Sequence, residues 1–342
     1  MSNQKTNSLF VILALAAVFL FILDLAYGPV SIPIEDVVKS LFGGKASKET
    51  WDYIVVNYRL PKAITAVLAG MGLSISGLLM QTLFRNPLAG PYVLGLSSGS
   101  SLGVAFVVMG AGLIPGFLSV WMLSSYGIIL ASCLGSFAVL IAVLAVSQRL
   151  RDTMAILIVG LMFGSFTSAI VSILTYFSTA EQLQKYTFWA MGNLGNLSWL
   201  SILILSVCVS VGLLISIFCI KSLDALLLGE NYAKSLGLNY RKARFLIIIA
   251  TSLLAGSITA FAGPIAFVGL AVPHMAKLLF RTSNHKILFF ATLLFGAIIL
   301  LVCDILCQFP GSDVTLPINA ITSLIGAPVV IWLLMRKRNA FD

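Results

Sequence analysis

Two carboxylates lie within apolar stretches of the sequence, where ionisable groups are rare, costly and commonly functional. Asp304 lies near the end of the run 287–308, and Asp24 lies near the end of the run 8–27. In a membrane such groups could bind a coupling ion or a proton, although a proton-driven carrier normally has more of them. Because Asp304 is within one turn of the expected helix end, we interpret it as a capping group or a hydrogen-bond partner of a neighbouring loop.

No set of residues in the sequence indicates bond chemistry. His274 and His285 have no Cys, Asp or Glu at metal-ligand spacing, so we interpret both as helix-end or loop residues. The serine-rich segment 97–101 lacks a Gly-x-Ser-x-Gly elbow and a partner base. The sequence contains no Gly-x-x-x-x-Gly-Lys-Ser/Thr phosphate loop. It therefore predicts no catalytic residue, no metal site and no cofactor, and any energy from ATP must come from another polypeptide.

Small residues recur at helical spacing in the first half of the chain. Gly95, Gly99 and Gly103 are four residues apart, as are Gly160 and Gly164. Faces of this kind let helices approach closely, so we expect close packing there. The same faces would also let helices shift against each other.

The composition is that of a membrane protein. Of 342 residues, 59% are hydrophobic and 10% are charged, whereas about a quarter of the residues in a soluble domain are charged. The net charge of +9 does not indicate a nucleic-acid partner, because the basic residues lie in short breaks between apolar runs instead of beside aromatics on one face.

The apolar runs predict about ten membrane-spanning helices, since a span needs about 20 mainly apolar residues. They lie near residues 8–27, 59–83, 93–113, 123–147, 154–177, 198–220, 245–262, 266–280, 287–308 and 318–335. Residues 245–280 could instead form one span with a broken, re-entrant piece. The first run is interpreted as a retained span, because no small-residue cleavage site follows it.

The basic residues predict the orientation of these spans. Fifteen of the 21 Lys and Arg residues fall on one side, and the other side keeps only Lys39, Lys45, Lys48, Arg59, Lys62 and Lys185. Because cytoplasmic loops carry an excess of Lys and Arg, this distribution predicts an even number of spans with both termini in the cytoplasm.

Two polar segments are too long to be simple turns. Residues 28–58 are expected on the outer surface, with a short amphipathic helix. Residues 221–244 are expected inside, as two short helices parallel to the membrane with Gly229 and Gly237 as stops. An ordinary connecting loop is the alternative for 221–244.

A faint internal repeat completes the predicted fold class. Residues 91–96 (PYVLGL) are similar to residues 264–270 (PIAFVGL). Transporters are often built from two related halves, although chance similarity between apolar runs is the alternative. We therefore predict an all-α polytopic membrane protein of about ten helices in two weakly related halves.

Several motifs, in order over residues 55 to 335, resemble one transporter family. The first half contains Arg59-Leu60-Pro61-Lys62, Ser76-Gly77, Gln81, Arg85-Asn86-Pro87-Leu88-Ala89-Gly90-Pro91 and Leu94-Gly95. The second half contains the run 263–270, Pro273-His274, Gly296-Ala297, Asp304, Leu316-Pro317 and Gly326-Ala327-Pro328. Together they resemble the FecCD/BtuC-type permeases of iron-chelate (siderophore or haem) and cobalamin ABC importers.

The resemblance implies a BtuC-like type II ABC importer fold, with residues 1–342 as a single transmembrane permease domain. It implies a homodimer around a central pathway in the plasma (inner) membrane, surrounded by lipid. A pair of ATPase subunits and a substrate-binding protein, periplasmic or a lipoprotein, are the implied partners. The cargo would be a bulky metal chelate, first an iron(III)-siderophore, with haem or cobalamin as alternatives. An ion-coupled secondary transporter is a further alternative, disfavoured by the sparse intramembrane carboxylates.

The resemblance also assigns roles by position, none of them enzymatic. Arg59 and Lys62 match basic residues that dock the binding protein. The cytoplasmic gate is matched by Asn86, Leu88, Asp152 and Thr153. The elbow that couples to the ATPase is matched by Leu228, Gly229, Glu230, Ala233, Leu236 and Gly237. This chain departs from the pattern at Gln308, where the family has a third arginine, and at residues 315–319, where Glu-Leu-Pro-x-Gly becomes Thr-Leu-Pro-Ile-Asn.

Overall fold

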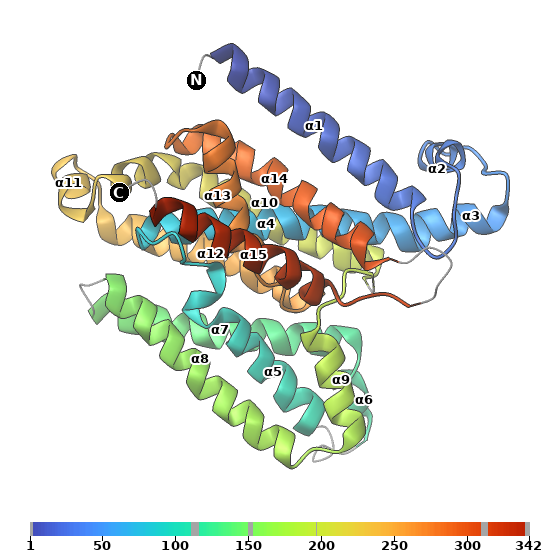
Figure 1. Ribbon diagram of the computed structural model, residues 1–342. Helices are drawn as coiled ribbons and strands as arrows, with labels where there is room; N and C mark the ends of the chain where they lie inside the picture. Colours follow the sequence, from blue (N-terminus) through green and yellow to red (C-terminus); the bar gives the residue numbers. More distant parts are fainter. Residues whose placement is uncertain (1–2, 111–115, 150–152, 196, 309–313, 339–342) are drawn as a thin grey trace. The chain divides into compact units, whose positions relative to one another are not determined.

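The computed structural model describes residues 3–110, 116–149, 153–195, 197–308 and 314–338 (Figure 1). The chain divides into two compact units. Unit 1 comprises Met1–Ile75, Asn193–Val207 and Ile265–Asp342, and unit 2 comprises Ser76–Gly192 and Cys208–Pro264. We describe each unit by itself.

Each of the ten predicted spans corresponds to a helix. They are α1 (Asn3–Ala26), α4 (Leu60–Leu83), α5 (Leu96–Gly110), α7 (Ser125–Arg149), α8 (Thr153–Tyr176), α10 (Trp199–Leu227), α12 (Tyr240–Ala262), α13 (Val268–Phe280), α14 (His285–Cys307) and α15 (Ile318–Arg338). Within the described ranges, seven helical stretches are long and apolar enough to cross a membrane, and Leu96–Gly110, Val268–Phe280 and Ile318–Trp332 are shorter apolar helices. The prediction of a polytopic all-α fold is confirmed.

The open alternative over 245–280 is resolved as one full-length helix followed by a short one. Gly263, with a φ of +74°, ends α12, and Phe267, with a φ of +65°, precedes α13. A similar left-handed residue, Gly95, lies between the 3₁₀ helix η2 (Pro91–Leu94) and α5. Since α13 continues through Pro273, His274 lies inside this helix, and its expected place at a helix end or in a loop was wrong.

In unit 1, α14 contacts α1, α13 and α15. The backbones of α4 and α14 approach closely at Gly70 and Gly296, where a Cβ added to Gly70 would lie 2.2 Å from the Gly296 carbonyl oxygen. The Ser74 hydroxyl donates to the Gly70 and Thr292 carbonyls at 2.6 and 3.1 Å, so it contacts both helices. Leu13, Ala276, Phe280 and Ala291 form a buried apolar cluster beside this crossing.

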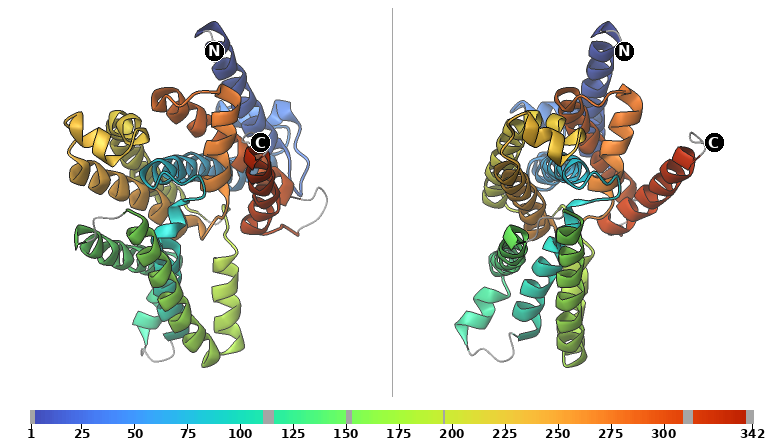
Figure 2. Two further views of the ribbon diagram at one scale, coloured as in Figure 1. Left: turned by 60° about the vertical axis from the view of Figure 1, so that its left-hand side comes forward. Right: turned by 90° about the vertical axis from the view of Figure 1, so that its left-hand side faces the viewer.

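In unit 2, α5 packs against α7 and α8, which lie beside it in both views of Figure 2. A Cβ on Gly99 would lie 2.5 Å from the Gly135 carbonyl oxygen, and one on Gly103 would lie 2.1 Å from that of Ala131. A Cβ on Gly95 would lie 2.9 Å from the Gly160 carbonyl oxygen. The expected close packing of these glycine faces is confirmed.

The segment 28–58 holds more helix than expected. It contains α2 (Ile34–Leu41), α3 (Glu49–Ile54) and the π-helical turn η1 (Val55–Arg59), and the stretch Glu49–Leu83 is helical over 35 residues. The Ser47 N–H and hydroxyl both donate to Asp36 Oδ1 at 2.8 Å and hold the pKa of this carboxyl below its usual range. These bonds fix the loop between α2 and α3.

The segment 221–244 holds less separate helix than expected. Because α10 runs on to Leu227 and α12 begins at Tyr240, a single short helix, α11 (Glu230–Ser235), lies between them instead of two. Gly229 precedes α11 with a φ of +102° and Gly237 follows it with a φ of +84°, as predicted for helix stops. Two further short helices, α6 (Phe117–Met122) and α9 (Ala180–Ala190), were not predicted.

The glycine contact in unit 1 gives a direct test. Gly296→Ala would put a Cβ 2.1 Å from Ser74 Oγ and 2.2 Å from the Gly70 carbonyl oxygen, and overpacking of this kind costs about 1–3 kcal/mol of stability. Thermal unfolding of the detergent-solubilised protein should therefore shift down. The control is Gly110→Ala, a helical glycine with open space around its Cβ, which should be neutral or stabilising. An unchanged melting temperature for Gly296→Ala would contradict the packing described here.

Candidate functional site

Arg59 is buried and faces the end of α1. Its Nη1 atom donates to the Leu25 and Ala26 carbonyls, at 2.8 Å each, and Nη2 donates to the Val30 carbonyl. The last carbonyls of a helix have no partner within the helix, and a cation is favourable at that end. Arg59, which ends η1, therefore satisfies the end of α1 and joins it to the beginning of α4.

Lys62 lies about one turn further along and pairs with Asp304 of α14. The Lys62 Nζ–Asp304 Oδ1 distance is 2.9 Å, and the side chains are 21% and 2% exposed. The carboxylate is thus almost fully removed from solvent while the ammonium group keeps some access. Asp304 therefore bonds to a neighbouring helix, not to a loop as expected.

Gln308 connects this pair to α1. Its Nε2 donates to Asp24 Oδ1 at 3.1 Å and to the Asp304 carbonyl at 3.4 Å. Asp24, Arg59, Asp304 and Gln308 are all buried. We name Asp24, Arg59, Lys62, Asp304 and Gln308 the buried ionic cluster.

The buried ionic cluster ties the ends of α1, α4 and α14 together through charged and amide groups. The sequence pointed to Arg59, Lys62 and Asp304 one by one, but not to their mutual contacts, because the partners are far apart in the chain. Gln308, where the pattern that the sequence resembles has an arginine, is an amide that can donate to a carboxylate without adding a third cation.

Asn319 satisfies a backbone group in the segment before α13. Its Oδ1 atom accepts the Ala266 N–H at 3.0 Å. Next to it, Gly326 of α15 packs against Phe267, since a Cβ on Gly326 would lie 2.3 Å from the Phe267 Cβ. Asn319 thus bonds the irregular backbone between α12 and α13.

In unit 2, the predicted gate loop follows α4 directly. The Asn86 side-chain oxygen accepts the Leu88 N–H at 2.9 Å, and the Asn86 carbonyl accepts the Ala89 N–H at 3.1 Å, which makes a compact turn. Leu88 is exposed. Asp152 lies outside the described residues, and Thr153 is described only as the first residue of α8.

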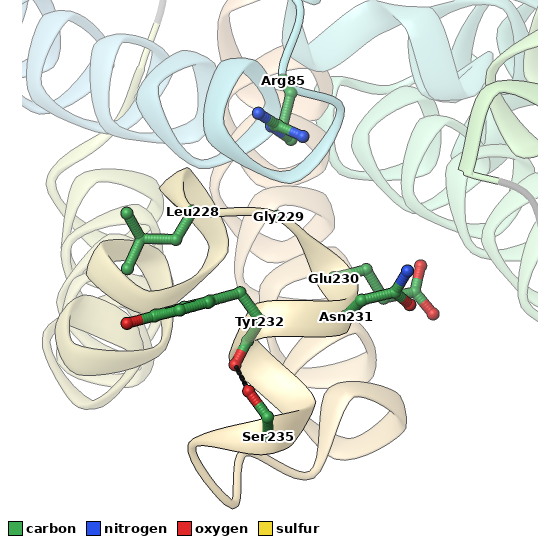
Figure 3. A pocket seen from close by; sticks show the side chains of 7 residues that line it. All are labelled: Arg85, Leu228, Gly229, Glu230, Asn231, Tyr232 and Ser235. Carbon is green, nitrogen blue, oxygen red and sulfur yellow. Dashed lines mark hydrogen bonds between the residues drawn. The ribbon is translucent and has the colours of Figure 1, made fainter.

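Three of the six residues predicted to couple to an ATPase, Leu228, Gly229 and Glu230, line one groove. The groove has a volume of about 700 Å³ and is lined by Arg85, Leu228, Gly229, Glu230, Asn231, Tyr232 and Ser235 (Figure 3). Glu230 pairs with Lys234 at 2.5 Å along α11, and Ala233 is buried on the inner face of this helix. We name residues 228–237 the elbow. Arg85, which comes from the end of α4, was not among the predicted coupling residues.

Nothing in these two sites forms a metal centre. In the part of the chain that the structure describes, no three His, Cys, Asp or Glu side chains are grouped to hold a metal ion. The charged groups join helices or line a surface groove. Fold and sites together define a polytopic helical membrane protein.

Comparison with known proteins narrows this class. Residues 15–336 match the FecCD transport family. The chain is 32% identical over 302 residues to the hemin transport system permease protein HmuU of Yersinia pestis, a match that covers 88% of both chains. It is 36% identical over 284 residues to the vitamin B12 import system permease protein BtuC of Klebsiella pneumoniae, a match that covers 82% of both.

A solved structure agrees with these relatives. An ABC transporter assigned to the metal-chelate type, in an inward-facing conformation, aligns with a TM-score of 0.84 and 29% identity, covering 96% of this chain and 99% of that chain. This protein belongs to the FecCD transport family, and its fold is that of a BtuC-like ABC importer permease. The family and fold implied by the sequence motifs are confirmed.

The ion pair between Lys62 and Asp304 predicts an asymmetric response to substitution. Lys62→Met leaves a buried carboxylate without its cation, and loss of one partner of a buried pair costs about 3–5 kcal/mol. Asp304→Asn should cost less, since Lys62 keeps solvent access. The double variant Lys62→Met/Asp304→Leu should recover most of the stability. Thermal unfolding of all three measures this, and equal, additive losses would contradict the ion pair.

Proposed function

We propose that this chain is the membrane permease subunit of an ATP-driven importer for a bulky metal chelate. The observation that carries the proposal is the agreement, over 96% of the chain at a TM-score of 0.84, with an ABC transporter assigned to the metal-chelate type. An iron(III)-siderophore is the first candidate for the cargo, as the sequence resemblance implies. Haem and cobalamin are the alternatives, and the relatives named for hemin and vitamin B12 transport support them.

The energy would come from two ATPase subunits. The sequence has no phosphate-binding loop of its own, and the elbow offers exposed apolar side chains, Leu228 at 60% and Leu236 at 61%, to a partner. ATP-driven closure of the ATPases would draw two elbows together in a homodimer and tilt the helices that they join. Asn86, Leu88, Asp152 and Thr153 would then form the gate of the central pathway.

The orientation follows from the basic residues. With both termini and the elbow in the cytoplasm of a cell with a plasma (inner) membrane, the segment 28–58 and the buried ionic cluster lie toward the outer face. Residues 1–342 would act as a single permease domain. A substrate-binding protein would deliver the cargo on that outer face, and no nucleic acid takes part.

Arg59 and Lys62 are the proposed docking residues for this binding protein. The exposed fraction of the Lys62 side chain, 21%, gives it the more accessible cation, whereas Arg59 is 7% exposed and donates to backbone carbonyls. Lys62 should therefore supply the larger part of any docking energy. Docking by Arg59 would require it to leave the α1 carbonyls.

An ion-coupled carrier fits the contacts less well. Asp304, the clearest intramembrane carboxylate, is held by Lys62 at 2.9 Å, and Asp24 accepts a hydrogen bond from Gln308 at 3.1 Å. Both groups are already used to join helices.

Vesicles that hold only this polypeptide should accumulate no hemin, cobalamin or ferric siderophore against a gradient.

The elbow provides a test of the ATPase partnership. Leu228→Asp/Leu236→Asp should abolish co-purification of the cognate ATPase and ATP-dependent uptake, because a carboxylate replaces each exposed apolar contact. The control Tyr53→Asp changes a side chain that is equally exposed, at 60%, on α3, and should retain the ATPase. Stoichiometric ATPase on the doubly substituted permease would refute this use of the elbow.

The docking role needs variants that keep the helices joined. Asp304→Asn leaves the Lys62 cation in place, whereas Lys62→Gln/Asp304→Asn removes it but keeps a neutral hydrogen-bonding pair. Affinity for the cognate binding protein, measured on the permease in lipid nanodiscs, should fall about 5- to 30-fold for the double variant only, the effect of about 1–2 kcal/mol. Equal affinity for both variants would remove Lys62 from the docking surface.

A further inference from the structure

Arg85 occupies a backbone position that normally belongs to glycine. The Arg85 N–H donates to the Thr82 carbonyl at 3.2 Å and the Asn86 N–H donates to the Gln81 carbonyl at 3.1 Å, which ends α4 in a Schellman turn. In this turn Arg85 has a φ of +47°. A left-handed conformation is strained for a residue with a Cβ, and such residues cluster at functional sites.

The same turn ends α11 with the usual residue. There the Gly237 N–H donates to the Lys234 carbonyl at 3.0 Å and the Leu238 N–H donates to the Ala233 carbonyl at 3.1 Å, with a φ of +84° at Gly237. The turn after α11 thus has glycine at its left-handed position, whereas the turn after α4 has arginine. Arg281, which follows α13, has the same φ of +47°, so what distinguishes Arg85 is the place of its side chain in the groove.

The Arg85 guanidinium lies against Gly229, the residue that precedes α11. A Cβ added to Gly229 would lie 3.3 Å from Arg85 Nη1 and 4.0 Å from Cζ. Arg85 thus forms one wall of the groove whose other wall is α11 and the residues before it (Figure 3). Glu230, the acidic residue of this groove, already pairs with Lys234.

Electrostatics favour this contact. Gly229 follows directly on the end of α10, a helix of 29 residues, and its N–H donates to the Leu226 carbonyl at 3.0 Å. The C-terminal end of a helix carries a partial negative charge, so a cation beside Gly229 is stabilised there. The flat surface of a glycine lets the planar guanidinium approach closely.

We propose that Arg85 is a positioning residue that links the elbow to the gate loop within one subunit. Its backbone is fixed in the turn that Asn86 continues, and its side chain lies beside Gly229 of the elbow. Asn86 in turn bonds the Leu88 and Ala89 N–H groups. A displacement of the elbow is therefore passed to residues 86–88 without an intervening helix. This inference rests on the proposed function for the roles of gate and elbow.

The link itself is tested by a distance measurement on the full-length permease in lipid nanodiscs. Spin labels are placed at Leu88→Cys and Leu236→Cys after the native cysteines are replaced by alanine. Arg85→Gly should broaden the distance distribution, although glycine relieves the backbone strain and should leave thermal stability equal or higher. Arg85→Lys keeps the charge without the planar group and should give an intermediate width.

A matched control separates the side chain from the backbone. Arg281 ends α13 with the same φ of +47°, but it does not line this groove. Arg281→Gly should therefore leave the distribution unchanged. A wild-type width for Arg85→Gly, or equal broadening for Arg281→Gly, would overturn the proposal.

Coupling is the second readout. In proteoliposomes with the ATPase and the binding protein, supplied separately with hemin, cobalamin and a ferric siderophore, Arg85→Gly should lower the cargo moved per ATP hydrolysed by at least about 5-fold, the lower end of allosteric coupling. Its hydrolysis rate should stay near that of the wild type. An unchanged ratio would refute the link. If the wild-type complex moves none of the three cargoes, the proposed function fails, while the distance measurement still decides on the link.

Discussion

Every polar group that enters apolar surroundings needs a partner, and this constraint organises unit 1. In lipid, an unsatisfied carboxylate or carbonyl costs several kcal/mol, so buried charges occur in groups. The last carbonyls of α1 accept hydrogen bonds from the Arg59 guanidinium, and Asp304 Oδ1 is paired with Lys62. Gln308 connects the two carboxylate-bearing helices. The polar groups that a transporter could use for coupling ions are used here to hold α1, α4 and α14 in register.

Close contact between helix backbones is the second interaction that holds the helices of each unit together. At Gly70 and Gly296 in unit 1, and at Gly99 and Gly135 in unit 2, no room is left for a single methyl group. Because water does not drive helices together inside a membrane, packing and hydrogen bonds between them must do so. Flat glycine faces give large contact without interlocking side chains. This arrangement suits helices that must keep contact while their angles change.

The spans could be predicted from the sequence because length and hydropathy alone define them. The short helices were harder to predict. Helix α9 carries a capping box, in which Thr179 and Gln182 bond each other's backbone N–H groups, and this Thr-x-x-Gln pattern was readable but lay in a short, mixed segment. Two short helices were expected in residues 221–244, but only α11 forms there, because α10 and α12 extend into this polar segment.

The candidate site could be predicted only in part from the sequence, for a different reason. Single residues such as Arg59, Lys62 and Gly229 stood out by type and motif, but a contact between residues 62 and 304 leaves no local trace in one sequence. Arg85 was visible within a motif, yet its left-handed backbone was not, because arginine gives no sign of a position where glycine is the rule.

The Asn319 side chain satisfies a backbone N–H group of an irregular segment. Asn319 is where this chain departs from the Glu-Leu-Pro-x-Gly pattern that it resembles, and here the side chain supplies the acceptor for a main-chain donor in the broken stretch before α13. The role of this side chain is therefore to satisfy the irregular backbone between α12 and α13.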